Sequence, residues 1–380
     1  MKKIIYFVLA AVCGMGMVAC GDHNVTESDK EAALKKVVPP YVNHTVIDTY
    51  SAMGDAGLLL LGDVEAIKEA VESGANYTNL MKQAGEHWRD MRHYWEQSEA
   101  FLYGPAEKHS IDPHIDSWPL DYNAMNALLS NEAQMQQIEE EGGAYVGDKL
   151  GYALKGFHAA EYLLFDAGQP HACNLTKAEA VYLVGIVEDL VQQAILLEDC
   201  WAGGVSAEKE ALITDEEGES MSYGENYGQW FIAASHPSWP TYQAVAEQII
   251  SGCVDIAGEV ADLKLGNPFR GSDNGGDSEY LESPYSRTST RDFVDNIISI
   301  QHAYAGAQKG DECVADYVKK QDAELNSKVL KTIEESIQLI EAIENFETTA
   351  QNNPQVKKAI DKVSELEEIL DDEVLPLLAK

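Results

Sequence analysis

Basic residues are scarce in this chain. It holds 27 Lys and Arg against 64 Asp and Glu among 380 residues, which gives a formal net charge of −37. Such an acidic surplus repels the phosphates of nucleic acids, so we expect no nucleic acid partner. The same surplus does not disfavour the binding of cations. Most acidic side chains on helical proteins, however, are simply solvated and bind no ligand. Charge alone therefore excludes one class of partner and identifies none.

Cysteines are few, and none is spaced as in a zinc or redox motif. The chain has six, and no two are separated by two residues. Cys173 and Cys200 flank an expected helix of roughly 39 Å, at ~1.5 Å per residue. A disulfide needs Cα atoms within ~7 Å, so these two cysteines should not bridge. A bridge between Cys253 and Cys313 is left open.

Long apolar runs are missing after residue 20, so we expect no transmembrane helix there. The N-terminus differs, because the basic MKK is followed by the apolar IIYFVLAAVCGMGM and then by MVAC. This order is typical of a secretory signal. Ala19 directly before Cys20 resembles a bacterial lipoprotein signal, cleaved before Cys20 and followed by lipidation of that cysteine. An ordinary secretory signal is the alternative.

We therefore expect a signal peptide over 1–19 and a polar tether over 20–40. The mature protein would belong to the cell envelope, anchored to the membrane by lipid at Cys20. The sequence leaves open whether it faces the periplasm or the cell surface.

Strand-like alternation of apolar and polar residues is also rare, and the helical period dominates. We predict an all-α fold without a significant sheet. The expected helices cover 42–73, 76–103, 121–139, 144–165, 175–200, 239–264, 290–319, 322–349 and 354–378. Thr176 with Glu179 forms a capping box, and Asn353 with Pro354 forms a helix start. The pattern predicts an N-terminal helical bundle over 41–205, a linker over 206–237 and a C-terminal bundle over 238–380.

The stretch GFHAAEYLLFD places His158 and Glu161 three residues apart on one helix face. Glu161 falls within an apolar stripe formed by Leu150, Leu154, Phe157 and Leu164. A carboxylate in such a stripe is costly unless it is paired or bound to metal. Gly156, just before this pair, would let another backbone or a ligand come close. A structural hydrogen bond between His158 and Glu161 is the simpler alternative.

A second polar stripe precedes it. Arg89, Arg92, Glu96 and Glu99 share one helical spacing. They form either a solvated face with internal ion pairs or a functional face on which Glu99 turns towards His158 and Glu161. The following IDSWPLD adds Asp116 and Trp118, although a tryptophan there more often serves packing.

Four blocks in order resemble the imelysin family, also called the insulin-cleaving membrane protease family. They are SEAFLYGP, IDSWPLD, the G-x-H-x-x-E of residues 156–161, and SPYSRTSTRDFVDNIISIQHAYAG. The resemblance covers about 40–380. It implies two four-helix-bundle-like domains packed against each other, with a site near their interface around His158 and Glu161. It also implies a bacterial envelope protein, a link of several members to iron uptake, and the peptidase activity in the family name.

The donor chemistry differs from that of zinc peptidases. H-E-x-x-H enzymes have two histidines four residues apart, whereas this motif has one histidine and one glutamate. Glu99 and Asp116 would complete a set of one nitrogen and three carboxylates. Oxygen-rich sets suit iron, manganese, calcium or magnesium better than a catalytic zinc.

We therefore expect a site built from Gly156, His158, Glu161, Glu99, Asp116, Trp118 and Arg92. Its expected metal ligands are His158, Glu161, Glu99 and Asp116. The favoured function is binding of a metal ion or an iron-related ligand during iron uptake, together with envelope proteins of that process. Iron is the favoured metal, and neither zinc nor calcium is excluded. The alternatives are a metal-dependent peptidase and a non-catalytic module that binds a peptide, haem or a partner protein.

Overall fold

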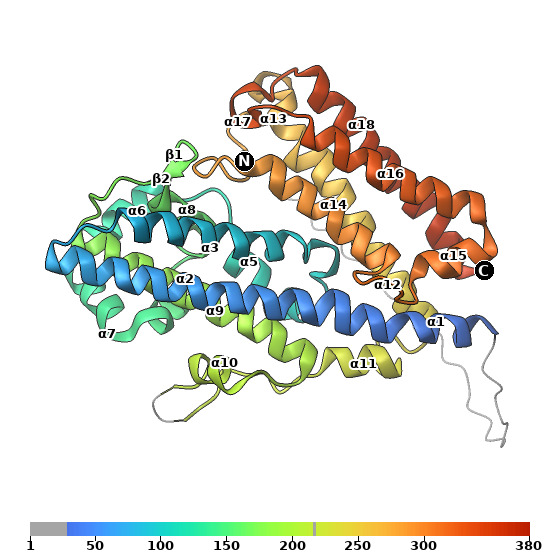
Figure 1. The fold of residues 1–380 in the computed structure, drawn as a ribbon, viewed down its shortest axis with the longest axis horizontal. Helices are drawn as coiled ribbons and strands as arrows, with labels where there is room; N and C mark the ends of the chain where they lie inside the picture. The colour runs from blue at the N-terminus through green and yellow to red at the C-terminus, as the bar shows by residue number, and fades with distance from the viewer. Residues whose placement is uncertain (1–28, 216–217) are drawn as a thin grey trace, which may run out of the picture.

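The computed structural model describes residues 29–215 and 218–380, and this part of the chain is predominantly helical (Figure 1). The predicted signal peptide, the lipidation at Cys20 and the first part of the tether lie outside the described residues. Within them, the sheet is limited to the hairpin of β1 Phe165–Asp166 and β2 Gln169–Pro170, in which Phe165 pairs with Pro170. The prediction of an all-α fold is confirmed.

The N-terminal half is a bundle around the buried helix α9. Its main helices are α2 Asp48–Ser73, α3 Thr78–Glu96, α7 Glu132–Lys149 and α9 Lys177–Ala202. Helix α2 packs against both α3 and α9, and α7 packs against α9. Helix α9 starts at the predicted capping box of Thr176 and Glu179. It is the one helix of the described residues long and apolar enough to cross a membrane, but 89% of that window is buried, as in a core helix.

The C-terminal half is a second four-helix bundle. It consists of α12 Tyr242–Glu259, α14 Ser289–Ala305, α16 Ala323–Glu341 and α18 Pro354–Ile369. A π-helical turn, Val260–Lys264, extends α12, and another, Leu370–Val374, joins α18 to α19 Leu375–Ala379. Helix α14 also packs against α3, and this contact joins the C-terminal bundle to one end of the N-terminal bundle (Figure 1).

Shorter elements complete the fold. These are α4 Pro105–Lys108, α5 Ile111–Ile115, α6 Tyr122–Leu129, α8 Gly156–Leu164, α10 Ala207–Leu212, α11 Tyr227–Ala233, α13 Gly266–Arg270, α15 Val314–Gln321 and α17 Phe346–Thr349, with 3-10 turns at Glu99–Phe101, Tyr152–Leu154 and Ser272–Asn274. The four cysteines at 173, 200, 253 and 313 are all free, so the bridge left open between Cys253 and Cys313 is not formed.

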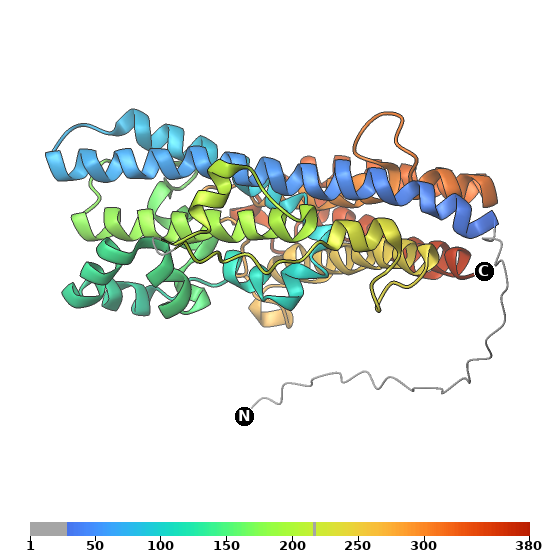
Figure 2. The same ribbon diagram turned by 90° about the horizontal axis from the view of Figure 1, so that it is seen from below.

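The predicted tether is wrong from residue 29 onward. Helix α1, Asp29–Pro40, buries Leu34, Val37 and Val38 and continues through the π-helical turn Tyr41–Ile47 into α2. This apolar face covers α12 of the C-terminal bundle, and Figure 2 shows the long α1–α2 rod running beside both halves. The proposed domain boundaries at 41, 206 and 238 stay predictions.

Several predicted helices are in fact broken. The helix expected over 144–165 is broken over 150–155, because Leu150 and Lys155 are extended; residues 144–149 are the end of α7, and α8 begins only at Gly156. Leu150 and Leu154 therefore do not share a helix with Glu161.

Three other breaks follow from local signals. The helix expected over 76–103 ends at Glu96. The helix expected over 121–139 is divided because the Asn131 side chain caps the start of α7. The helix expected over 290–319 is divided because Gly306, at φ +86°, ends α14.

Candidate functional site

Gly156 brings α8 into contact with the end of α5. Its φ is +76°, a conformation that favours glycine. A Cβ at this position would lie 2.0 Å from the carbonyl oxygen of Ile115, so no side chain fits there. The residue after Ile115 is Asp116, and this close approach places its carboxylate beside His158. Gly156 therefore allows the two backbones to pack closely, and this packing aligns the side chains of Asp116 and His158.

His158 and Asp116 form a buried ion pair. His158 Nε2 lies 2.9 Å from Asp116 Oδ1, and His158 is 2% exposed. Burial by itself lowers the pKa of His158, but the adjacent Asp116 carboxylate outweighs it and raises that pKa to about 9. The Trp118 ring meets the imidazole edge-on, with 4.9 Å between centroids. His158 is thus a protonated imidazolium at neutral pH.

Asp116 also binds Arg92 and Trp95 on α3. Arg92 Nη1 donates to Asp116 Oδ1 at 2.5 Å, and Trp95 Nε1 donates to Oδ2 at 2.8 Å. Burial tends to raise the pKa of Asp116, but Arg92 and His158 together hold it well below the usual range. Asp116 is therefore the anionic centre that joins α3, α5 and α8.

Glu161 connects the two bundles. Its Oε1 accepts hydrogen bonds from the backbone N–H groups of Tyr285 and Ser286, at 3.1 and 2.8 Å, and from Ser286 Oγ at 2.7 Å. Its Oε2 faces His158 Nδ1 at 3.7 Å, which is too long for a hydrogen bond. Both of these atoms are buried without a hydrogen-bond partner. The buried Glu161 carboxylate is thus stabilised mainly by hydrogen bonds from the loop before α14.

Arg92 is the central cation of the site. It is 1% exposed, and its Nη2 lies 2.5 Å from Glu96 Oε1 and 2.8 Å from Glu282 Oε1. Its Nε lies 4.0 Å from Asp292 Oδ2. The alternative of a solvated face is therefore wrong for Arg92 and Glu96, since both are buried. Burial raises the pKa of Glu96 to about 7, although Arg92 and Lys264 oppose the rise.

Lys264, at the end of the π-helical turn after α12, is a second buried cation. Its Nζ lies 3.5 Å from Glu96, 3.4 Å from Glu99 and 3.4 Å from Glu282. Glu99 reaches it from the 3-10 turn that follows α3, because the chain leaves the helix at Gln97. Burial raises the pKa of Glu99 well above its usual range, against the attraction of Lys264.

The site contains more carboxylates than cations. Six carboxylates lie in contact with three cationic groups; the carboxylates are Glu96, Glu99, Asp116, Glu161, Glu282 and Asp292, and the cationic groups are Arg92, Lys264 and His158. Burial raises the pKa of Asp292 well above the usual range, as it does for Glu99. Burial therefore favours the neutral form of these two carboxyl groups over the charged form.

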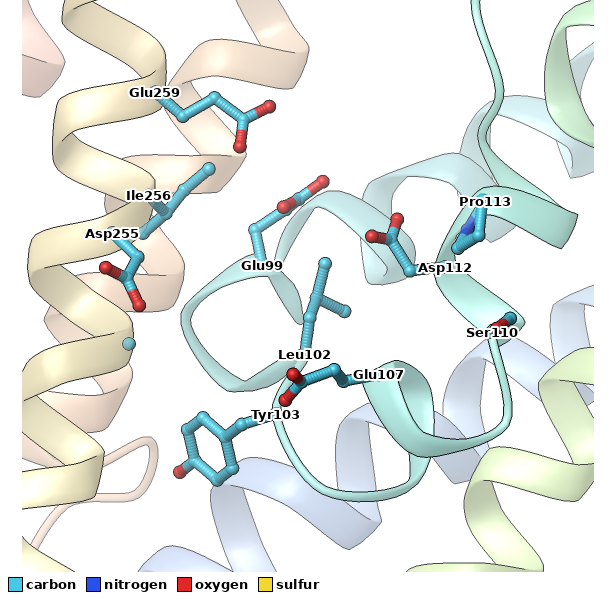
Figure 3. A pocket seen from close by; sticks show the side chains of 11 residues that line it. Glu99, Leu102, Tyr103, Glu107, Ser110, Asp112, Pro113, Asp255, Ile256 and Glu259 are labelled. Carbon is cyan, nitrogen blue, oxygen red and sulfur yellow. The ribbon is translucent and has the colours of Figure 1, made fainter. Parts of the chain in front are cut away.

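Two adjoining pockets lead to this cluster. The inner pocket, of about 280 Å³, is lined by Asp116, Trp118, His158, Lys264 and Glu282, among others. The outer pocket, of about 450 Å³, has no lysine or arginine among its lining residues. Glu99, Asp112 and Glu259 line both. Figure 3 shows Glu99 and Asp112 extending from the N-terminal half and Glu259 from α12, around one acidic hollow between the bundles.

The four predicted metal ligands are distributed over more than one group. Ligand atoms of Asp116, His158 and Glu282 lie within 4.8 Å of one another, and so do those of Glu96, Glu99 and Asp116. Glu161 belongs to neither group in the described residues. Asp116 is common to both, and the predicted ligand set stays a prediction. Of the other predicted site residues, Gly156 supports α8, Arg92 neutralises Asp116, and Trp118 packs on His158.

Sequence reasoning missed several residues of the site. Glu96 shares the predicted polar stripe with Arg92, and Ser286 and Asp292 lie within the last block that resembles the family, so the sequence holds a signal for these three. Glu282 is in a long polar loop, and Lys264 is at a helix end. The local sequence around Glu282 and around Lys264 does not distinguish either residue from an exposed one.

Comparisons with known proteins agree with this architecture. The imelysin family model matches residues 48–372. Iron-regulated protein A of Synechococcus elongatus is 25% identical over 353 residues, which cover 90% of this chain and 86% of that protein. A solved structure from Parabacteroides distasonis, described as an iron-regulated protein A precursor, has a TM-score of 0.74 at 25% identity and covers 94% of this chain and 97% of that one.

An imelysin-like protein from Psychrobacter arcticum shares the fold alone. Its TM-score is 0.62 at 11% identity, over 94% of this chain and 97% of that one. The family match extends through both bundles and includes every residue of the interdomain cluster. This chain therefore belongs to the imelysin family.

Proposed function

We propose that the interdomain site binds a metal ion, with iron favoured, or an iron-related ligand, as part of iron uptake. The observation that carries this proposal is the surplus of buried carboxylates beside an acidic pocket. Unpaired carboxylates are costly to bury, and burial raises the pKa of Glu99 and of Asp292 well above the usual range. A cation bound beside this cluster would supply positive charge that the protein's own cations do not provide.

Asp116, His158 and Glu282 are the residues best placed to hold the ion. They offer one imidazole nitrogen and two carboxylates, a donor set that suits iron or manganese. Binding would require His158 to release its proton, Arg92 to give up its contacts with Asp116 and Glu282, and Lys264 to move away from Glu282. A metal held there would supply a positive charge beside the pocket. The same requirement predicts weaker binding in acid, where protons compete for the ligands.

The relatives support a connection with iron. Two of them carry iron regulation in their names, one from Synechococcus elongatus and one from Parabacteroides distasonis. We further propose that Cys20 carries lipid and that the protein acts at the cell envelope beside proteins of iron uptake. Replacing Cys20 by alanine should release the protein from the membrane fraction or leave the signal uncleaved, which fractionation and mass spectrometry would detect.

Metal binding is tested on the metal-depleted mature chain by anaerobic titration with Fe²⁺ and by elemental analysis. We expect one ion per site, and at least tenfold weaker binding in His158→Asn and Glu282→Gln. His171→Asn changes a half-buried residue and Glu210→Gln an exposed one, both outside the pocket, and they serve as matched controls. Fe²⁺ binding of equal affinity in all four variants would refute the proposed ligands.

The peptidase alternative is separated by incubating the same proteins with unfolded polypeptide substrates. The binding proposal predicts no cleavage by the wild type with or without Fe²⁺. Cleavage that a chelator stops and that His158→Asn lacks would instead favour a metal-dependent peptidase at the same site.

A further inference from the structure

A second group of metal-ligating side chains lies away from the interdomain site. His109 follows α4, Cys200 lies near the end of α9, and Glu225 precedes α11. Their ligand atoms lie within 4.8 Å of one another. His109 Nε2 is 2.9 Å from Glu225 Oε2. Three segments of the chain that are separated in sequence thus converge on one point, and none of these residues lines the interdomain pockets.

The three donors are an imidazole nitrogen, a thiol sulfur and a carboxylate oxygen. Such mixed sets suit zinc and similar divalent cations, which accept sulfur and nitrogen in tetrahedral sites. A simple ion pair between His109 and Glu225 would not require a thiol. Cys200 is fully buried and free, and burial raises its pKa to about 12, so it is a poor candidate for a nucleophile.

The surroundings of the cluster are compatible with an ion. The Tyr223 ring stacks on His109, with centroids 3.5 Å apart and an interplanar angle of 8°, which orients the imidazole. Lys108 contacts the other carboxylate oxygen of Glu225, and its side chain is 53% exposed. Because the Lys108 side chain is exposed to solvent, it can move away from Glu225 and remain hydrated. His109 and Tyr223 also line a cleft of about 1010 Å³ next to the cluster.

The required rearrangement is small. Bonds of ~2.0 to 2.3 Å in tetrahedral geometry place neighbouring ligand atoms about 3.3 to 3.8 Å apart. The His109–Glu225 contact would lengthen slightly, and the thiol would move closer and lose its proton to solvent. A water molecule from the cleft would occupy the fourth position.

We propose that His109, Cys200 and Glu225 form a second metal site that binds a zinc-class divalent cation, independent of the interdomain site. Its thiolate ligand distinguishes it, because the residues that line the interdomain pockets include no cysteine. The two sites can therefore be measured separately in one protein.

Cobalt is the probe for this site. The metal-depleted, reduced mature chain, with Cys20→Ser and Cys173→Ser to remove unrelated thiols, is titrated with Co²⁺ under anaerobic conditions. We expect a thiolate-to-cobalt charge-transfer absorption that saturates at one ion per chain and disappears when Zn²⁺ is added. His158→Asn should leave the absorption unchanged, whatever it does to iron binding.

Matched variants assign the ligands. Cys200→Ser should abolish the absorption, whereas His109→Gln and Glu225→Gln should weaken cobalt binding at least tenfold. Cys253→Ser is the control, since Cys253 is also a buried helical thiol but donates to the carbonyl oxygen of Ile249. If Cys200→Ser does not fold, the cobalt affinities of His109→Gln and Glu225→Gln decide whether these residues form the site. No charge-transfer absorption in the parent protein, or an absorption that persists in the ligand variants, would overturn the proposal.

Discussion

At the scale of single residues, the geometry of the interdomain site depends on Gly156 and His158. Gly156 allows the backbone of α8 to touch the end of α5, and this contact positions His158 against Asp116. The imidazolium and the Arg92 guanidinium then share one carboxylate. A change at either position therefore alters both the packing and the charge balance of the site.

Replacing Gly156 by alanine should destabilise the protein. The new Cβ would clash with backbone atoms of Ile115, and the φ of +76° would be strained for any other residue. We expect the free energy of unfolding in urea to fall by about 2–5 kcal/mol. Gly151→Ala is the control, because no atom lies within 4 Å of its Cβ position and its φ is −67°. Equal stability of the two variants would contradict this account of the motif.

The contribution of His158 to stability should depend on pH. Its pKa in the folded protein, about 9, exceeds the ordinary value of 6.5, so the folded state holds the proton more tightly than the unfolded chain. This stabilisation is complete below about pH 6.5 and is lost as the pH rises through about 9.

Urea unfolding of the wild type and of His158→Gln, with chelator present, measures this effect. The stability advantage of the wild type should shrink by up to about 3 kcal/mol between pH 6 and pH 10. A difference that stays constant over this range would show that His158 is not protonated in the folded protein.

At the scale of elements, the short helix α8 holds the loop that precedes α14. Glu161 accepts two backbone N–H groups and one hydroxyl of this loop through a single oxygen. Glu282 and Ser283 lie a few residues earlier in the same loop, and Ser283 Oγ donates to Asp292 on α14. The loop thereby brings Glu282 to Arg92, so Glu161 helps to complete the site without lying in either candidate ligand group.

Replacing Glu161 by glutamine should loosen this loop. Hydrogen bonds to a charged group contribute about 1.5–3 kcal/mol each, so the amides of Tyr285 and Ser286 should exchange with deuterium roughly 10- to 100-fold faster. Ser286→Ala removes only the hydroxyl contact and should have a smaller effect. Glu179→Gln, in the capping box of α9, is the matched control and should affect exchange only near residue 176. Unchanged exchange at Tyr285 and Ser286 in Glu161→Gln would contradict the proposed role.

At the scale of the whole molecule, the two bundles are joined by buried ionic contacts. Arg92 and Glu99 of the N-terminal half bind Glu282 and Lys264 of the C-terminal half. His93 on α3 also binds Asp295 on α14, with 2.7 Å between Nδ1 and Oδ2. Removal of one partner from a buried ionic group leaves the others without compensation, so the interface should couple the stability of both halves.

The protein should consequently unfold in one transition. All six tryptophans lie within residues 88–239, so tryptophan fluorescence reports the N-terminal half and the connecting segment, whereas far-UV circular dichroism reports all helices. The two urea curves should coincide in the wild type. In Arg92→Met both urea curves should shift together, because the free energy of unfolding should fall by about 3–5 kcal/mol. Separated transitions in the wild type would show that the bundles unfold independently.

Properties that depend on local spacing could be predicted from the sequence. The helical period predicted the all-α class, the capping residues Thr176 and Asn353 predicted helix starts, and three-residue spacing placed His158 and Glu161 on one face. These signals are local, because a helix and its cap involve residues within about one turn of each other.

Which side chains meet in the site depends on the packing of distant segments. Glu161 accepts hydrogen bonds from backbone groups that are 124 and 125 residues away in the sequence. Lys264 contacts Glu99, which is 165 residues away. The polar stripe of Arg92 and Glu96 is compatible in sequence with a solvated face, and it is buried because α14 packs against α3. Pairing across the interface depends on how whole helices pack, and residue spacing along one helix carries no information about that packing.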